Sequence, residues 1–290
     1  MNKGLLEKYT GAAAAYSVRL LDRNYTGPLF KIRRVDVVSS QSNGEIFVFP
    51  DDEGWISVDS KVVDPSNVSS ATVLGEFVNA QSYTQADGSV IGGNPQHAFI
   101  SVWKDQSGNA NDASQEVAGN QPKIYDAVNG IITENGKPAV EFDGSNDHLD
   151  TADFTPLTQP NFITLTHKGN VANGTKWIFS TSTSNTNRNF FLQDGRYYAG
   201  SFVSSGSVGT SQVNISILAD GANTEVFKNG LSVVTGNAGT NGIQKIRLFA
   251  DRDGGVSLSA LFQEFILWNS NDSNRTDIED DINKAFNIYS

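Results

Sequence analysis

Short apolar segments separated by turn-forming residues recur from residue 139 to residue 268, and this spacing constrains the fold more than any other feature. The segments read FITLTHKG, WIFSTST, RNFFLQDG, RYYAGSFV, KIRLFAD and LSALFQEFILW, with Gly, Asn and Ser between them. Segments of this length and punctuation are typical of strands joined by tight turns. The sequence therefore predicts an all-β fold, an antiparallel β-sandwich.

Two dipeptides mark the tightest of these turns. Asn229-Gly230 stands between Phe227-Lys228 and Leu231-Ser232, and Asn-Gly is the dipeptide that a two-residue type I′ hairpin favours. A second turn is expected at Asn135-Gly136, directly before the predicted strand Ala139–Phe142. Both positions predict antiparallel neighbours.

Helical signals are confined to the two ends of the sequence. Residues 12–21, AAAAYSVRLL, combine strong helix formers and predict a short N-terminal helix. The segment 273–289 predicts a C-terminal helix, which Ser273 or Asn274 can cap and whose first half is acidic. Its apolar residues share one face: Ile278, Ile282 and Phe286.

Charge and composition restrict the class of protein. The 290 residues carry a net charge of −11, which disfavours binding to nucleic acid or to an anionic membrane surface. Cysteine is absent, so disulfides, thiolate metal sites and cysteine nucleophiles are excluded. The residues before Lys8 include no apolar stretch of the kind that a secretory signal requires.

Several motifs together resemble known β-sandwich families. The order EFDGSNDHL, VFKNGLSV and FQEFILWN before an acidic helix resembles concanavalin A-like (laminin-G-like) jelly-roll domains over residues 120–290. The stretches AAAAYSVRLLDRNYTGPLFKIRR, WKDQSGNANDASQ, QPKI and NGKPAVEF resemble the opening of the arabinofuranosidase B catalytic domain. The resemblance implies one jelly roll over residues 26–290. Residues 1–25 would form an arm that packs on this sandwich or on a neighbouring molecule.

The arabinofuranosidase resemblance also implies a catalytic carboxylate pair. That family hydrolyses α-L-arabinofuranosides with retention, and the matching positions here are Asp194 in RNFFLQDGRYYAG and Asp253 in KIRLFADRDGG. The likeness is incomplete, because Asp194 replaces a Glu that is one methylene longer and the family's vicinal cysteines are absent. Asp194-Gly195 can equally form a hairpin turn, and Asp251 and Asp253 before two glycines allow the same alternative.

The block FISVWKDQSGNANDASQ carries a cluster of oxygen-bearing side chains at near-alternate spacing. They are Asp105, Asn109, Asn111 and Asp112. Such oxygens are the ligands that Ca²⁺ prefers, so a calcium site is one hypothesis. The alternative is a set of turns in which these side chains bond the local backbone at the end of a strand.

Aromatic side chains supply candidates for binding sugars. Strand alternation places Tyr197 and Tyr198 on opposite faces, and with Asp251 they form the predicted carbohydrate-binding set. Trp103 and Trp268 lie in apolar segments and are predicted to be core residues.

Three functions follow from these observations. Modules resembling this one recur in bacteriophage structural proteins, so the main prediction is a non-enzymatic virion protein of the capsid-decoration, head-fibre or tail-adhesin type. It would be homo-oligomeric, reside in the virion and bind other virion proteins or cell-surface glycans. The first alternative is a retaining glycoside hydrolase related to α-L-arabinofuranosidase, and the second is a calcium-dependent carbohydrate-binding module.

Overall fold

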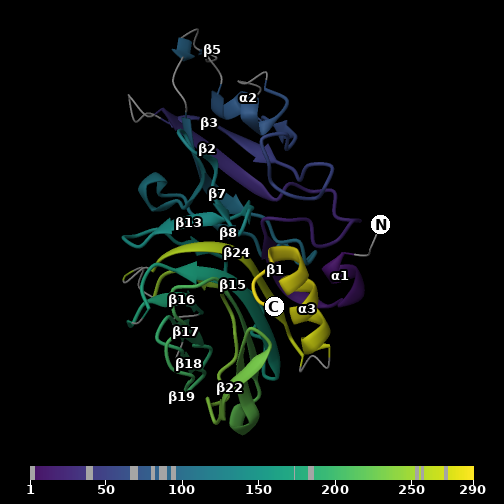
Figure 1. The fold of residues 1–290 in the computed structure, drawn as a ribbon, viewed down its shortest axis with the longest axis vertical. Coiled ribbons are helices and arrows are strands. Elements are labelled where there is room, and N and C mark those ends of the chain that lie inside the picture. Colours follow the sequence, from purple (N-terminus) through teal and green to yellow (C-terminus); the bar gives the residue numbers. More distant parts are fainter. Residues whose placement is uncertain are drawn as a thin grey trace.

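The computed structural model describes residues 4–36, 42–65, 71–79, 82–84, 90–92, 96–172, 174–181, 186–251, 255, 258–270 and 274–290. Its antiparallel strands form one connected 20-stranded sheet and two small hairpins, and the large sheet folds into a sandwich of two layers with a third layer beside it (Figure 1). We name these layers the front, back and N-terminal sheets. The prediction of an all-β antiparallel sandwich with a short N-terminal and a C-terminal helix is confirmed, although the N-terminal helix lies at Leu5–Lys8 and not over residues 12–21.

The front sheet is built around its longest strand. This strand, β24, pairs along one edge with β1 and β13 and along the other with β15, which continues to β20, β21 and β22. The strands are β1 (Ala12–Ser17), β13 (Val140–Asp143), β24 (Ser259–Trp268), β15 (Asn161–Gly169), β20 (Val213–Ala219), β21 (Thr224–Lys228) and β22 (Leu231–Gly236).

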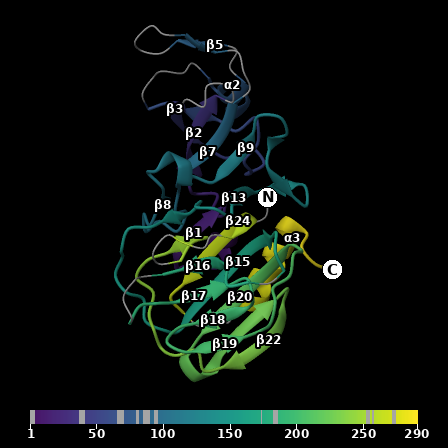
Figure 2. The same ribbon diagram turned by 90° about the vertical axis from the view of Figure 1, so that its left-hand side faces the viewer.

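The back sheet covers the inner face of the front sheet (Figure 2). In spatial order its strands are β14 (Leu149–Asp150), β23 (Arg247–Leu248), β16 (Trp177–Ser180), β17 (Phe190–Leu192), β18 (Arg196–Tyr198) and β19 (Phe202–Ser204). Aromatic side chains join the two sheets. Phe179 meets Phe265 at 5.5 Å between ring centroids, and Phe142 stacks on Phe249 at 4.1 Å.

The N-terminal sheet extends the sandwich at one end. Its strands are β4 (Val62–Val63), β3 (Ser42–Val48), β2 (Phe30–Asp36), β7 (Gln96–Trp103), β9 (Lys123–Asp126) and β10 (Gly130–Ile131). One residue pair, Lys123 with Glu141, joins β9 to β13, and β8 (Ala113–Ser114) bridges β7 to β14. The front and N-terminal sheets therefore meet at β9 and β13.

The remaining elements are short. Two small hairpins pair β5 (Ser82–Thr84) with β6 (Val90–Gly92) and β11 (Thr133–Glu134) with β12 (Lys137–Pro138). The helices are α1 (Leu5–Lys8), α2 (Leu74–Asn79), α3 (Arg275–Phe286) and the 3₁₀ turns η1 (Ala118–Asn120) and η2 (Gly221–Asn223). No helix in the part of the chain that the structure describes is long and apolar enough to cross a membrane.

The predictions of the Asn229-Gly230 turn and of the C-terminal helix are confirmed. Asn229 and Gly230 both adopt positive φ, 53° and 79°, as a type I′ turn requires, and they join β21 to β22. The C-terminal helix α3 begins after Asn274 and buries its predicted apolar face, which consists of Ile278, Ile282 and Phe286.

The helix predicted over residues 12–21 is wrong, because residues 12–17 form strand β1. Ala14, Ala15 and Tyr16 are completely buried beside β24. Small side chains allow this close approach, and the hydrogen bonds and burial gained there outweigh an intrinsic helix preference of a few tenths of a kcal/mol per residue. The division into an arm over 1–25 and a sandwich over 26–290 stays a prediction, although β1 is paired within the front sheet.

Candidate active site

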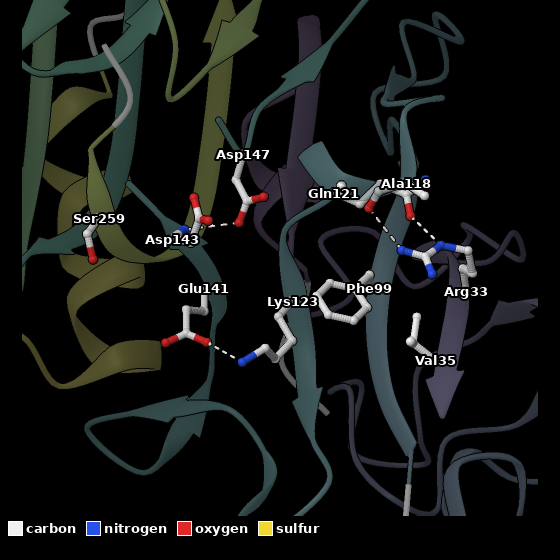
Figure 3. A pocket seen from close by; sticks show the side chains of 11 residues that line it. Arg33, Val35, Phe99, Ala118, Gln121, Lys123, Glu141, Asp143, Asp147 and Ser259 are labelled. Carbon is white, nitrogen blue, oxygen red and sulfur yellow. Dashed lines mark hydrogen bonds and ion pairs between the residues drawn. The ribbon is translucent and has the colours of Figure 1, made fainter. Parts of the chain in front are cut away.

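A cleft of about 620 Å³ lies where the N-terminal sheet meets the front sheet. Strands β2, β7, β9 and β13 supply its walls, together with η1 and the turn after β13. Figure 3 shows carboxylates gathered on one side, an arginine and a glutamine on the other, and Lys123 and Phe99 between them. A cavity of this size is within the range that small-molecule sites occupy.

The acidic side of the cleft is built by β13 and its following turn. Glu141 and Asp143 are two residues apart on β13 and therefore point to the same face. The segment Asp143–Asp147, DGSND, then turns back: Gly144 adopts φ 81°, and the Asp143 carboxylate accepts the Ser145 amide at 2.7 Å. This turn brings Asp147 beside the two strand carboxylates (Figure 3).

The surroundings of Asp147 shift its pKa. Its side chain is buried, with 6% of the residue exposed, and one carboxylate oxygen accepts the Asp143 amide at 3.0 Å. The pKa of Asp147 is raised to about 7, chiefly by burial and in part by the charges of Asp143 and Glu141, while the hydrogen bond from the Asp143 amide and the charge of Lys123 oppose the change. Asp147 therefore retains its proton in a pH range where surface carboxyls are ionised.

Hydrogen-bond donors line the opposite side. Arg33 donates from Nε to the Gln121 side chain at 2.8 Å and stacks over the Phe99 ring at 5.2 Å. Lys123 approaches Glu141 at 3.1 Å between Nζ and Oε2. The cleft thus combines a protonated acid, a charged carboxylate held by a lysine, and an arginine on an aromatic ring.

This arrangement can carry out acid-assisted hydrolysis. Two carboxyl groups whose surroundings hold one protonated and leave the other charged are the standard requirement for cleaving a glycosidic bond. The donors and the ring opposite suit the hydroxyl groups and the apolar face of a sugar. From the sequence alone, EFDGSNDHL serves only as evidence for the fold. The grouping of Glu141, Asp143 and Asp147 around one turn is the sequence feature that could have indicated this site.

The structure places Asp194 elsewhere, in the turn between β17 and β18. Gly195 adopts φ 82° and donates to the Leu192 carbonyl at 2.9 Å, so Asp194-Gly195 forms the hairpin turn that was the alternative interpretation. The Asp194 carboxylate pairs with Arg196 at 2.6 Å.

Its predicted partner Asp253 lies outside the described residues. Asp251, after β23, accepts the Gly255 amide through its carboxylate at 2.7 Å. Strand β16 lies between β17 and β23, so one strand separates the segments that carry Asp194 and Asp251. The assignment of Asp194, Asp251 and Asp253 as catalytic or sugar-binding residues stays a prediction.

The cluster around Asp105 ties its loop to β1. The Asp105 carboxylate accepts the amides of Ala15 at 2.8 Å, Ser107 at 2.9 Å and Asn111 at 3.0 Å, so both of its oxygens are engaged. The side-chain amides of Asn109 and Asn111 donate to backbone carbonyls of β1, and Asp112 pairs with Lys104.

No group of three His, Asp or Glu residues suited to a metal occurs among the residues that the structure describes. The side-chain bonds of the Asp105 cluster match the alternative in which these residues form turns. The calcium hypothesis for Asp105, Asn109, Asn111 and Asp112 stays a prediction.

Tyr197 and Tyr198 separate as strand alternation predicts. Tyr197 is fully buried between the sheets, and its hydroxyl donates to the Asn189 side chain at 2.6 Å. Tyr198 lies on the outer face of the back sheet, where it stacks on Phe190 at 4.8 Å. Of the two rings, only Tyr198 is placed to contact a ligand. Trp103 and Trp268 are core residues, as predicted.

Comparisons with known proteins identify the fold but not the family. No protein-family profile and no curated protein matches the sequence. Among solved structures, the chain is similar to a GH54 α-L-arabinofuranosidase soaked with a cyclic sulfate inhibitor, with TM-score 0.63 and 12% identity over 99% of this chain. An arabinofuranosidase complexed with arabinofuranosyl-α-1,2-xylobiose matches with TM-score 0.61 and 13% identity over 96% of this chain.

The chain spans about 65% of the length of these arabinofuranosidases. At such low identity the likeness shows a shared sandwich fold. The prediction of a bacteriophage virion protein is contradicted, because three solved structures that match 96% or more of the chain are arabinofuranosidases. That prediction relied on departures from an enzyme family's site, namely Asp194 in place of a Glu and the absent cysteines. Such departures are not evidence for a structural role.

Proposed function

We propose that the protein is a glycoside hydrolase acting on arabinofuranoside-bearing polysaccharide, with the cleft of Figure 3 as its active site. The observation that carries the proposal is the buried Asp147 carboxyl, whose pKa is raised to about 7 and which lies on the same side of the cleft as Glu141 (Figure 3). The fold shared with GH54 arabinofuranosidases supports the choice of substrate class.

The roles of the residues follow from their surroundings. Asp147 gives its proton to the glycosidic oxygen as the bond between that oxygen and the anomeric carbon breaks. Glu141 stabilises the positive charge that develops on the sugar, and Lys123 fixes its position. A water oxygen then bonds to the anomeric carbon, and the proton that water releases restores the acid. Arg33 and Gln121 bind sugar hydroxyls on the opposite wall.

The test compares variants at the two competing sites. Turnover of 4-nitrophenyl α-L-arabinofuranoside and of arabinan is measured for the parent, Asp147→Asn, Glu141→Gln and the matched control Asp194→Asn. We expect the first two to lose about 100- to 10,000-fold in kcat on arabinan. Asp147→Asn should lose less on the nitrophenyl substrate, because nitrophenolate departs without a proton.

The controls separate an incorrect site from an incorrect activity. Thermal unfolding of each variant shows whether its fold is as stable as that of the parent. An unchanged Asp147→Asn together with an inactive Asp194→Asn would move the site to the β17–β18 turn. Absence of turnover by the parent on both substrates would refute the proposed hydrolase.

A further inference from the structure

A row of aromatic rings crosses the outer face of the back sheet. Phe190, Tyr198 and Phe202 are directly paired across β17, β18 and β19, so their rings lie side by side. The ring centroids are 4.8 Å apart for the first pair and 4.9 Å for the second. Trp177 on β16 adjoins Phe190 at 4.3 Å. The row is separate from the main core and is 50% exposed at Phe202.

Arg188 lies across this row. Its guanidinium carbon is 4.9 Å from the centroid of Phe190, 5.6 Å from that of Tyr198 and 6.0 Å from that of Trp177. Contact with several rings fixes the guanidinium in place and removes part of its water shell. The charge is therefore held at a defined position on an aromatic surface.

Within the described part of the chain, Arg188 has no carboxylate partner. Its Nε is buried and makes no hydrogen bond, although leaving a buried donor unpaired is unfavourable. Neighbouring Arg196 differs, because its guanidinium is paired with Asp194 at 2.6 Å. In a protein of net charge −11, an arginine held on aromatic rings without an anion is a specific feature that the fold alone does not require.

We propose that this surface, formed by Arg188, Tyr198 and Phe202, binds the carboxylate-bearing sugars of an acidic polysaccharide. The apolar face of a pyranose ring packs on Phe202 and Tyr198, and the uronic acid carboxylate pairs with the Arg188 guanidinium. Charge complementarity selects this occupant over a neutral glycan. The site is on the back sheet, away from the cleft between the front and N-terminal sheets (Figure 1), so it is independent of the proposed hydrolysis.

The experiment measures the affinity of trigalacturonic acid for the full chain by calorimetry, with its methyl ester as the neutral probe. We expect the acid to bind and the ester to bind at least about 10-fold more weakly, with an affinity for the acid that falls as salt rises. Arg188→Gln should weaken binding of the acid about 10- to 100-fold, and Arg188→Lys should weaken it less.

Two further variants complete the test. Phe202→Ala should weaken binding of the acid and the ester alike, because it removes the stacking face. Arg23→Gln, which removes a charge paired with Glu7 outside this surface, should change neither. No binding of the acid, equal binding of the ester, or an unchanged Arg188→Gln would overturn the proposal, as would self-association of the protein that Arg188→Gln abolishes. The binding experiment does not depend on turnover of arabinofuranosides, so failure of either proposal leaves the other intact.

Discussion

The side chain of Asp147 accepts a hydrogen bond from the backbone amide of Asp143 at 3.0 Å, across the turn that follows β13. The residue that we place as the acid of the cleft thus also closes the turn that positions it. One carboxylate oxygen accepts the hydrogen bond that closes the turn, and the residue also lines the cleft. Substitutions at this position therefore need a stability measurement beside any activity measurement.

The pH dependence of stability should report the buried Asp147. Its pKa is raised from 3.8 to about 7 in the folded protein, so folding favours the protonated form. The stability that this group contributes is complete below about pH 4 and is lost as the pH rises through 7. We expect the Tm to fall between pH 5 and pH 8 more for the parent than for Asp147→Asn. Asp153→Asn, at an exposed position, should retain the parent's slope.

His167 should give folding stability the opposite pH dependence. Burial lowers its pKa to about 4, and a hydrogen bond between Nε2 and the Gln193 side chain at 3.1 Å only partly offsets this. Folding favours the neutral ring, so the stability from this group is complete above pH 6.5 and declines as the pH falls to 4.

Urea unfolding of His167→Gln at pH 7 and pH 5 tests this expectation. The variant should lose less free energy of unfolding than the parent on going from pH 7 to pH 5. His148→Gln, at a half-buried position, is the matched control. An identical loss in His167→Gln and the parent would contradict the assignment.

Replacing only one residue of the ion pair between Arg19 and Glu264 should strongly reduce the free energy of unfolding. The Glu264 side chain is 1% exposed and accepts from Arg19 Nε at 2.9 Å and from Ser17 Oγ at 2.7 Å. Glu264→Gln should reduce the free energy of unfolding by about 3 to 5 kcal/mol, because it leaves Arg19 without its anion. Replacing both residues, as in Arg19→Met with Glu264→Leu, should cost much less. A double variant as unstable as the single one would refute this account.

Removal of the Asp105 carboxylate should destabilise the protein, because this carboxylate connects its loop to β1. Asp105→Ala leaves the amides of Ala15 and Asn111 without acceptors, so we expect a loss of about 2 to 4 kcal/mol in chemical denaturation. Asp153→Ala is the exposed control. Thermal unfolding of the parent with CaCl₂ or EDTA tests the calcium hypothesis. A Tm raised by calcium supports an ion at this loop, and equal Tm values remove it.

Features encoded by neighbouring residues could be predicted from the sequence. The Asn229-Gly230 turn and the apolar face of α3 depend on the conformational preferences of a few adjacent residues, and both are present. The segment 12–17 could not be assigned in this way. Its alanines favour a helix in isolation, and only pairing with β24, about 250 residues later, makes the strand more stable.

In the candidate site, too, some features depend on neighbouring residues and others on contacts between distant parts of the chain. Glu141, Asp143 and Asp147 are close in sequence, so their grouping could have been recognised. Arg33 and Phe99 reach the cleft from β2 and β7, whose pairing no local pattern specifies. The burial that raises the pKa of Asp147 is a property of the assembled sheets and has no counterpart in the sequence.

The central position of β24 has a consequence for how the protein is made. Strands β1 and β13 both pair with β24, so each leaves the ribosome before its partner exists. At 5 to 20 residues per second, β1 waits roughly ten seconds to a minute for residue 268 to be synthesised. During translation its unpaired edge must be shielded by a chaperone or by transient contacts with the nascent chain.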